Sequence, residues 1–396
     1  MDPRLELAGL VGRVGYQIAK ERVFRPRPTT LREVPPSPEA LTTEWLTRAL
    51  CDGVPGAAVT GYALGARNDG TSARRAMRVG YNDAGREAGL PEALFTKSGP
   101  TFLNRMVGAG AGLARVESSF YALVRPQLDI EAPTTQYSAY DPVSHRQLLI
   151  TDDVTVTRGA TFGTALDRTL SREQAEQLVD TLAGLHARFW QAPLQRMFGS
   201  WLQDSYELIL TLNVAIGAEA RIRAGFERAR EVIPARVYAR RAEVHPALMR
   251  SQLLDVSSGP LTFLHGDVHP GNWYVTGDGR MGLYDWQLSV RGGPARDLAY
   301  ALSTHLDIAQ RRAWERELLD RYLGKLDEAG VKSELTGDEL FLGYRRQLCY
   351  AMLAWLATIG RSPLQPRYQP DEISLANLER IATAFDDLDT LGAVGA

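Results

Sequence analysis

The sequence predicts an α+β protein in two lobes: a small lobe built on an antiparallel sheet with one key helix, and a large, mainly helical lobe. Strand-like runs surround one helix-like run before residue 153, and runs with helical spacing dominate after it. A chain of 396 residues with 44% hydrophobic content can bury two cores rather than one. We expect an extension at residues 1–40, a first lobe at 41–153 and a second lobe at 154–396.

The extension begins with an amphipathic stretch that runs to about Phe24, and the proline-rich residues 25–38 predict an extended linker. Packing on the body of the protein is the default expectation for it, and dimerisation is the alternative. Thr42 or Thr43 is expected to cap a helix that ends at Leu50, because a threonine hydroxyl accepts a hydrogen bond from a free N–H of the first turn.

A glycine-containing loop at residues 65–72 joins strand-like runs at residues 60–64 and 73–81. Gly70 would let the backbone approach a phosphate closely, and the hydroxyls of Thr71 and Ser72 could donate hydrogen bonds to it. The loop is neither a Walker A motif nor a GxGxxG motif. By itself it therefore indicates only a hairpin, and its interest comes from the segment that follows.

Lys97 stands out because lysine is scarce in this chain. Of the 45 basic residues only four are lysine, and Lys97 ends a strand-like run at residues 92–97. A compact ammonium group that must reach phosphate oxygens is not interchangeable with a guanidinium. Alone, Lys97 would be interpreted as a solvated lysine at a strand end.

Glu117 changes that interpretation. Residues 111–128 carry apolar side chains at helical spacing, and Glu117 falls on their packed face, with no basic residue three or four positions away. A buried carboxylate is costly unless it is paired. We therefore expect an ion pair between Lys97 and Glu117, the pair that positions the nucleotide phosphates in kinase-like enzymes.

The segment His265-Gly-Asp-Val-His-Pro-Gly-Asn272 is the richest in chemical groups, and Asp285 follows it by thirteen residues. An Asp followed after four residues by an Asn, and then by an Asp on the next strand, is the spacing used for phosphoryl transfer. Asp267 is thus the candidate base. Asn272 and Asp285 are candidate ligands of Mg²⁺, which prefers oxygen donors.

A hairpin around Asp278 and Gly279 would bring the two candidate ligands together. If these residues form a two-residue turn, Asn272 lies directly opposite Asp285. A hydrolytic metal centre built on His265 and His269 is the alternative, but the other four histidines are isolated in the sequence.

The second lobe is predicted to start with a long helix from Ser171 to Trp190, in which His186 is a satisfied core histidine rather than a catalyst. Further helices are expected near residues 203–232, 234–250, 309–330 and 337–360. A helical insertion at residues 192–255 could form an acceptor pocket. Its mixed charge with many arginines argues against a strongly cationic acceptor. A hydroxylated natural product, a nucleoside-type antibiotic, a sugar and a sterol-like alcohol all remain open.

Composition excludes several other classes. A formal net charge of −2 argues against nucleic acid or an anionic membrane as the main partner. No run reaches the roughly 18 apolar residues of a membrane span, and the first residues lack a secretory signal pattern. Two cysteines far apart in the sequence predict reduced thiols and a cytoplasmic protein. We expect a monomer or a homodimer.

These segments occur in an order that resembles the aminoglycoside phosphotransferase and choline kinase superfamily over residues 45–360. The Asp285-Trp-Gln triplet and the Glu117-x-x-Phe-Tyr segment look closest to its ecdysteroid-kinase-like branch. The resemblance implies a protein-kinase-like fold. It also implies Mg²⁺-dependent transfer of the γ-phosphoryl group of ATP or GTP to a hydroxyl of a small molecule, with antibiotic inactivation as one role.

The resemblance also assigns roles to residues. Asp267 would accept or orient the substrate hydroxyl proton, with Mg²⁺ bound by Asn272 and Asp285 and the loop supported by His265, His269 and Asp297. The nucleotide would be held by Gly70, Thr71, Ser72, Lys97, Glu117 and an adenine-contacting linker at residues 148–153 with Ile150 and Asp152. The competing functions are a catalytically silent nucleotide-binding module and a protein kinase.

Overall fold

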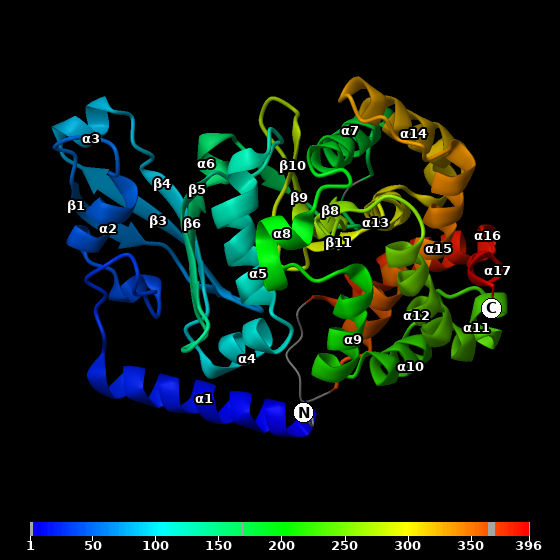
Figure 1. Ribbon diagram of the computed structural model, residues 1–396, viewed down its shortest axis with the longest axis horizontal. Helices are drawn as coiled ribbons and strands as arrows, with labels where there is room; N and C mark the ends of the chain where they lie inside the picture. The colour runs from blue at the N-terminus through cyan, green and yellow to red at the C-terminus, as the bar shows by residue number, and fades with distance from the viewer. Residues whose placement is uncertain (1–2, 168, 363–368, 396) are drawn as a thin grey trace. The chain divides into compact units, whose positions relative to one another are not determined.

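The computed structural model describes residues 3–167, 169–362 and 369–395. The chain forms two compact units (Figure 1). Unit 1 comprises residues 1–128 and 132–160, and unit 2 comprises residues 129–131 and 161–396. The predicted α+β class is confirmed, with a small antiparallel-sheet unit and a large, mainly helical unit. Residues 1–40 belong to unit 1.

Unit 1 is built on an antiparallel sheet with the strand order β1-β3-β4-β6-β5. Its strands are β1 (Val59–Leu64), β3 (Ala73–Tyr81), β4 (Ala93–Ser98), β6 (Arg146–Asp152) and β5 (Thr135–Asp141). A short strand, β2 (Asn68–Asp69), pairs with β3 inside the glycine-containing loop. The strand carrying Lys97 is therefore an interior strand, paired on both sides.

Two helices cover opposite faces of this sheet (Figure 1). Helix α2 (Thr43–Leu50) is capped by Thr42, whose hydroxyl accepts a hydrogen bond from the Trp45 N–H. Helix α5 (Leu113–Ser119) packs on β5 and β6. The helix predicted over residues 111–128 changes pitch, because π-helical and 3₁₀ turns follow α5. The other helices of unit 1 are α1 (Pro3–Phe24), α3 (Asp83–Glu87), α4 (Phe102–Gly110) and α6 (Val154–Thr157).

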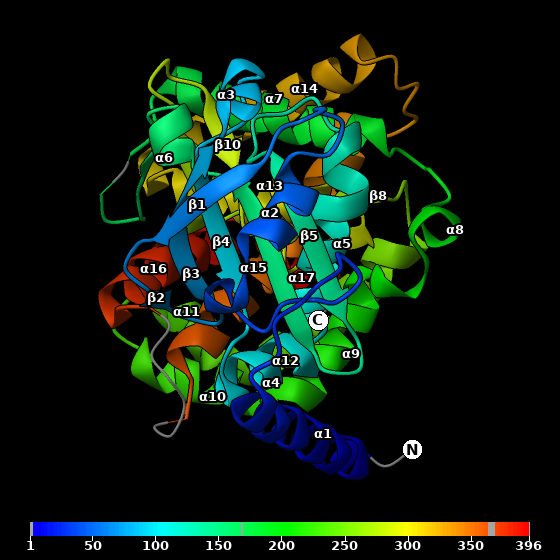
Figure 2. The same ribbon diagram turned by 90° about the vertical axis from the view of Figure 1, so that its left-hand side faces the viewer.

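The N-terminal stretch is one long helix, α1, which packs on α4 (Figure 2). Val14 and Ile18, one turn apart, are buried in this contact. Packing on the body of the protein, the default expectation for the extension, is confirmed. Its alternative, a role in dimerisation, stays a prediction.

The strand β6 corrects one prediction. Residues 148–153 were expected to form a linker that contacts adenine, but residues 148–152 lie in an interior strand between β4 and β5. Ile150 belongs to the buried core beneath α2, and both carboxylate oxygens of Asp152 accept hydrogen bonds within unit 1, from Thr134, Thr157 and Arg158. Both side chains therefore have partners within unit 1, and a contact of this segment with the nucleotide stays a prediction. A run of buried apolar residues is typical of a strand covered on both faces.

Unit 2 carries two small sheets among its helices. One has the order β10-β9-β7, and the other pairs β11 with β8. Their strands are β7 (Thr161–Phe162), β8 (Thr262–Leu264), β9 (Trp273–Val275), β10 (Met281–Leu283) and β11 (Val290–Gly292). The helices are α7 (Arg172–Arg188), α8 (Leu194–Phe198), α9 (Ser205–Ile216), α10 (Ala218–Arg228), α11 (Ala235–Ala239), α12 (Arg241–Ser257), α13 (Ala295–His305), α14 (Ile308–Glu328), α15 (Gly337–Ile359), α16 (Asp371–Asp387) and α17 (Thr390–Val394).

The helix predicted near residues 203–232 is two helices, α9 and α10. They are separated by Gly217, whose left-handed backbone conformation (φ 65°) ends α9 and begins α10. Glycine adopts this conformation without steric cost. The sequence prediction passed over this signal because the apolar spacing continues on both sides of the break.

The hairpin between β9 and β10 has a different register from the predicted one. Met281 pairs with Val275 and Leu283 with Trp273, so the next position opposite Asn272 is Tyr284, whose N–H donates to the Asn272 carbonyl. The loop has one more residue than a two-residue turn, and Gly279 adopts a left-handed conformation in it (φ 87°). The prediction that Asn272 lies directly opposite Asp285 is therefore wrong by one residue.

Within the described ranges, no helix is long and apolar enough to cross a membrane. Cys51 lies in unit 1 and Cys349 in unit 2, and both are buried free thiols.

Candidate functional site

The candidate catalytic loop of unit 2 turns on Gly266, which follows β8. Its φ of 81° is in the left-handed region, and a side chain here would lie 2.1 Å from the Leu288 carbonyl oxygen. Only glycine fits these two constraints. The carbonyl of Gly266 accepts a hydrogen bond of 2.8 Å from the Tyr350 hydroxyl of α15. The loop is thereby anchored to a helix more than 80 residues away in the sequence.

Asp297, near the start of α13, holds the same loop from the other side. Its carboxylate accepts hydrogen bonds from the N–H groups of His265 (2.8 Å) and Gly266 (2.9 Å). Burial would raise the pKa of Asp297, but the hydrogen bonds that its carboxylate accepts, first from His186, hold the pKa below its usual value. Asp297 is therefore an ionised carboxylate that fixes the loop backbone.

His186 of α7 is a buried partner of that carboxylate. Its Nε2 lies 3.4 Å from Asp297, and its Nδ1 lies 2.9 Å from the Tyr322 hydroxyl. Both ring nitrogens thus have a partner inside the protein. The predicted role as a satisfied core histidine is confirmed.

His265 joins the loop to the segment that carries Asp285. Its Nε2 lies 3.1 Å from the Tyr284 carbonyl, and its Nδ1 accepts a hydrogen bond from the Asp267 N–H. Burial lowers the pKa of His265, against opposing contributions from Asp297, Asp267 and Asp285. The ring is therefore neutral with its proton on Nε2, and it lies within electrostatic reach of both predicted functional aspartates.

Asp267 is half-buried and has three polar neighbours. The Asn272 side-chain N–H₂ donates to both the backbone carbonyl (2.8 Å) and Oδ2 (2.9 Å) of Asp267. Nε2 of His269 lies 3.8 Å from the same oxygen. Burial, followed by the charge of the nearby Asp267, raises the pKa of Tyr300 well above its usual value. The carboxylate is thus fixed in one orientation.

His269 supports the loop at the point where it turns into the 3₁₀ segment Pro270–Asn272. Its Nδ1 accepts a hydrogen bond from the Gly271 N–H, and its ring packs against Trp355 with centroids 5.2 Å apart. Since His265 uses both nitrogens on backbone groups and His269 uses one, these residues do not form the alternative hydrolytic metal centre. The described residues contain no group of three or more His, Cys, Asp or Glu side chains arranged to hold a metal.

The predicted magnesium ligands fit an oxygen-binding cation. Because the Asn272 N–H₂ group donates twice to Asp267, its amide oxygen is directed elsewhere and can act as a donor. Asp285 has a φ of 65°, which is unusual for a residue with a side chain. Such strained residues cluster at ligand sites. One amide and one carboxylate would leave the rest of a Mg²⁺ shell to water and phosphate oxygens, as this ion prefers.

Unit 1 contains the predicted ion pair. Nζ of Lys97 lies 2.7 Å from Oε1 of Glu117, and both side chains are buried. The other carboxylate oxygen, Oε2, accepts a hydrogen bond of 3.0 Å from Gln147 of β6. The ion pair predicted from the helical spacing is confirmed, and Gln147 is a partner that the sequence analysis missed, because cross-strand neighbours cannot be identified before the register is known.

Removing one member of this pair should destabilise the protein strongly. We expect Lys97→Met to lower the free energy of unfolding by about 3–5 kcal/mol, because Glu117 would become a buried charge without its cation. The double variant Lys97→Met/Glu117→Gln should recover much of that loss. Urea denaturation of the three proteins measures both effects, and equal losses in the single and double variants would contradict a coupled pair.

The glycine-containing loop lies beside this pair. Arg74 of β3 is the cross-strand partner of Lys97, so their side chains share one face of the sheet. Nε of Arg74 and Oγ of Ser72 are both buried without a hydrogen-bond partner among the described residues. A buried polar atom without a partner is costly. Two such atoms next to a lysine fit an anionic group such as a phosphate. Arg74 was not among the residues predicted from the sequence.

The arginines of the insertion have mainly structural roles. Arg221 donates to the carbonyl of Ala357, and Arg228 donates to the carbonyls of Ile359 and Arg361, at the C-terminal end of α15. Cations in this position satisfy the last carbonyls of a helix and its dipole. The large number of arginines in the insertion is therefore only weak evidence about the charge of the small-molecule acceptor.

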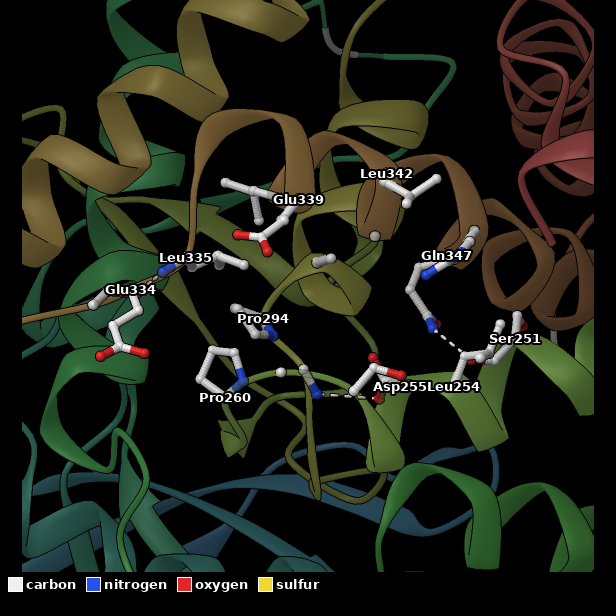
Figure 3. Close-up of a pocket in the computed structure, with 18 of the residues that line it drawn as sticks. Ser251, Leu254, Asp255, Pro260, Pro294, Glu334, Leu335, Glu339, Leu342 and Gln347 are labelled. Carbon is white, nitrogen blue, oxygen red and sulfur yellow. Dashed lines mark hydrogen bonds between the residues drawn. The ribbon is translucent and has the colours of Figure 1, made fainter.

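A separate cavity of about 520 Å³ lies in unit 2 between α12, the start of α13 and α15 (Figure 3). It is lined by Pro260 and Gly293, at the opposite end of the β8–β11 pair from the catalytic loop. Oδ2 of Asp255 accepts hydrogen bonds from the Ser205 hydroxyl (2.6 Å) and the Gly293 N–H (3.1 Å) beside this cavity. The cavity is thus distinct from the candidate site.

Asp255 gives the protein a pH-dependent stability. Burial raises its pKa from 3.8 to about 6, so the protonated carboxyl stabilises the folded state. This contribution is complete below pH 3.8 and is lost as the pH rises through 6. Relative to wild type, Asp255→Asn should gain about 1–2 kcal/mol of stability between pH 5 and pH 8, because part of the total of about 3 kcal/mol is already lost at pH 5. Thermal unfolding at both pH values measures this, and a difference independent of pH would contradict it.

The model of a family described as "Phosphotransferase enzyme family" matches residues 126–332, slightly more than half of the chain. The match covers the catalytic loop, Asn272, Asp285 and Asp297. No curated protein matches the sequence.

Solved structures of similar fold include a choline kinase from Streptococcus pneumoniae, with 11% identity, a TM-score of 0.47 and coverage of 83% of this chain and 94% of that chain. An aminoglycoside phosphotransferase from Streptomyces rimosus, in complex with ADP and streptomycin, has 16% identity, a TM-score of 0.42 and coverage of 72% and 90%. An ethanolamine kinase from Plasmodium vivax has 13% identity, a TM-score of 0.44 and coverage of 83% of each chain. Because these TM-scores are below 0.5, the assignment of a family rests on the family model.

Proposed function

The chain belongs to the phosphotransferase enzyme family, and we propose that it transfers the γ-phosphoryl group of ATP or GTP to a hydroxyl group of a small molecule with the help of Mg²⁺. The observation that carries this proposal is the environment of Asp267. Its carboxylate is oriented by Asn272 and flanked by His269 and Tyr300. The resemblance to the ecdysteroid-kinase-like branch of the superfamily stays a prediction.

Asp267 would act on the acceptor. It would accept the hydroxyl proton as the acceptor oxygen forms a bond to the γ-phosphorus, while the bond from that phosphorus to the bridging oxygen breaks and the nucleoside diphosphate leaves. Asn272 holds the carboxylate in place for this step. Mg²⁺, held by Asn272 and Asp285 when bound, would neutralise charge on the β- and γ-phosphates.

Lys97, Arg74 and Ser72 would contact the nucleotide phosphates. Glu117 and Gln147 fix the ammonium group of Lys97, so it needs no reorganisation when phosphate binds. The unpartnered Ser72 hydroxyl and Arg74 Nε–H would donate hydrogen bonds to the phosphate oxygens. Gly70 would let the backbone approach a phosphate closely, and the Thr71 hydroxyl could donate to it, as predicted from the sequence. The side chains of Ile150 and Asp152 take no part in this proposal, because they have partners within unit 1.

Helix α9 supports an acceptor with an apolar body. Its inner face packs against Leu264 of β8, the strand that leads into the loop of Asp267, and against Val290 of β11, which pairs with β8. Leu210 and Val214 of α9 remain 45% and 63% exposed, and Leu253 of the adjacent α12 is 49% exposed. A polycation would not gain from this surface. The acceptor we propose is therefore a natural-product, nucleoside or sterol-like alcohol rather than a polyamine sugar.

Two competing functions remain less well supported. A protein kinase would need a long activation segment after Asp285, but only β11 and short connections separate Asp285 from α13 in the structure. A catalytically silent nucleotide-binding module would not need the carboxylate of Asp267 to be oriented as it is. The family match favours an enzyme over the silent module.

A screen of hydroxyl compounds for nucleotide consumption tests the proposal. We expect consumption of ATP or GTP with at least one small alcohol, and none with the Asp267→Asn variant as the blank. Phosphorylation of a generic protein substrate instead would favour the protein kinase. Nucleotide binding without turnover on any alcohol would favour the silent module.

A further inference from the structure

Glu21, on the last turns of α1, is held by two arginines of unit 1. Its Oε1 and Oε2 accept hydrogen bonds from the two terminal nitrogens of Arg105, at 2.7 and 2.5 Å. Nε of Arg146 lies 2.9 Å from Oε1. The Arg105 side chain is fully buried and the Glu21 side chain is 10% exposed. This bidentate, charge-assisted contact is much stronger than a surface ion pair.

Arg105 fastens three parts of unit 1 to one another. Besides Glu21, it donates to the carbonyl of Gly99 (2.9 Å), two residues after Lys97, and to the carbonyl of Ser144 (3.2 Å) in the β5–β6 turn. Its guanidinium therefore holds the end of the strand that carries Lys97. Without Glu21, the buried charge of Arg105 would have only neutral hydrogen-bond acceptors. Because an unpaired buried charge is costly, helix α4, which carries Arg105, would tend to shift.

Asn104, the neighbour of Arg105 in the first turns of α4, holds the glycine-containing loop. Its side-chain N–H₂ donates to the carbonyls of Gly70 and Thr71, both at 3.2 Å. Its amide oxygen accepts the Thr101 hydroxyl (2.7 Å), and Thr101 in turn caps α4. The amide group is thus fully committed. Because Asn104 and Arg105 are consecutive, a shift of this turn moves both the loop and the end of β4.

We propose that α1, through Glu21, positions the glycine-containing loop and the end of the Lys97 strand for nucleotide phosphates, with Arg105 and Asn104 as positioning residues. The inference rests on the proposed function, since it assigns that loop and Lys97 to the nucleotide. Glu21 fixes Arg105, Arg105 and Asn104 fix the start of α4, and Asn104 fixes the carbonyls of residues 70 and 71. In this proposal, α1 helps to position the residues that contact the nucleotide phosphates.

Nucleotide affinity in matched variants tests this inference. Glu21→Gln keeps the size of the side chain and removes its charge, and Lys20→Gln changes an exposed charge on the same helix as the control. Asn104→Ala removes the contact with the loop while leaving the Glu21–Arg105 pair intact, so it provides a second route if Glu21→Gln folds poorly. The dissociation constant of a non-hydrolysable ATP analogue with Mg²⁺ is measured by calorimetry, well below each unfolding midpoint.

We expect Glu21→Gln and Asn104→Ala each to weaken binding of the analogue by about 3- to 30-fold, and Lys20→Gln to leave it unchanged. In turnover assays the KM for nucleotide should rise while the KM for the acceptor stays constant. The double variant should lose less affinity than the product of the single losses, because both changes act through one turn of α4.

Three outcomes would overturn the inference in different ways. If Glu21→Gln and Asn104→Ala lower the unfolding temperature but bind the analogue as wild type does, α1 has only a structural role. If the two losses multiply fully in the double variant, Glu21 and Asn104 do not act through one turn. If wild type itself binds no nucleotide, the proposed function fails first and the inference with it.

Discussion

Replacing Asp267 with asparagine or alanine is expected to lower kcat by on the order of 10²–10⁴, the usual contribution of a general base. Asparagine keeps an oxygen that can accept the hydrogen bond from Asn272, so the loop should hold its shape while the proton acceptor is lost. Steady-state kinetics on the acceptor found by screening measure the effect. The dissociation constant for nucleotide, measured in parallel, should change little.

Asp278→Asn is the matched control for this variant. Asp278 is an exposed carboxylate at the tip of the β9–β10 hairpin, bonded locally to Thr276 and Arg280. Its substitution removes one negative charge from the hairpin that follows the loop of Asp267 without touching that loop, so kcat should stay at the wild-type level. Full activity in both Asp267 variants would remove Asp267 from the role of base.

Replacing Asp285 with asparagine should abolish the Mg²⁺-dependent part of nucleotide binding. Asparagine tolerates the left-handed backbone conformation of this position better than most residues, so the loss would report the charge rather than backbone strain. A neutral amide contributes far less than a carboxylate to holding a divalent cation. Calorimetric titration of nucleotide, with and without Mg²⁺, separates the two parts of the affinity.

The control for Asp285→Asn is again Asp278→Asn, which should keep the full effect of Mg²⁺. Unfolding temperatures of both variants show whether the fold is retained. Mg²⁺-dependent affinity that is unchanged in Asp285→Asn would contradict the assignment of Asp285 as a metal ligand. Asn272→Asp offers a further check, because a second carboxylate should strengthen the binding of Mg²⁺ while disturbing the contact with Asp267.

Local patterns in the sequence were enough to predict much of unit 1. The Lys97–Glu117 ion pair followed from a charged residue on the packed face of a helix, and that rule depends only on helical spacing and the cost of burying a charge. In unit 2, the spacing of Asp267 and Asn272 likewise singled out a segment whose two side chains are joined by a hydrogen bond. Both are short-range signals that do not depend on how distant segments pack.

The predictions failed where a single extra residue sets the register of a hairpin, or where a neighbouring strand decides which face of the sheet a side chain occupies. The β9–β10 loop holds one more residue than predicted, which moved the partner of Asn272 from Asp285 to Tyr284. Leu149 of β6 is the cross-strand partner of Lys97, so their side chains lie on the same face of the sheet. Ile150, the next residue, points to the opposite face. Strand alternation therefore sends Ile150 to the core face. Apolar composition alone does not distinguish a linker from an interior strand.

Other contacts could not be predicted because they join residues far apart in the chain. Tyr350 reaches Gly266 from α15, and Glu21 reaches Arg105 from α1. A tyrosine in an apolar helix and a glutamate in an N-terminal extension carry no local mark of these partners. Only the packing of α15 and α1 brings the groups together.

The most direct test of the account is the transfer of the labelled γ-phosphoryl group from ATP or GTP to an acceptor identified in the hydroxyl-compound screen. Wild-type protein with Mg²⁺ should give a phosphate monoester of the acceptor and one equivalent of nucleoside diphosphate, with only trace product from Asp267→Asn. Bound nucleotide with no phosphorylated alcohol from wild type, or equal product from wild type and Asp267→Asn, would contradict it.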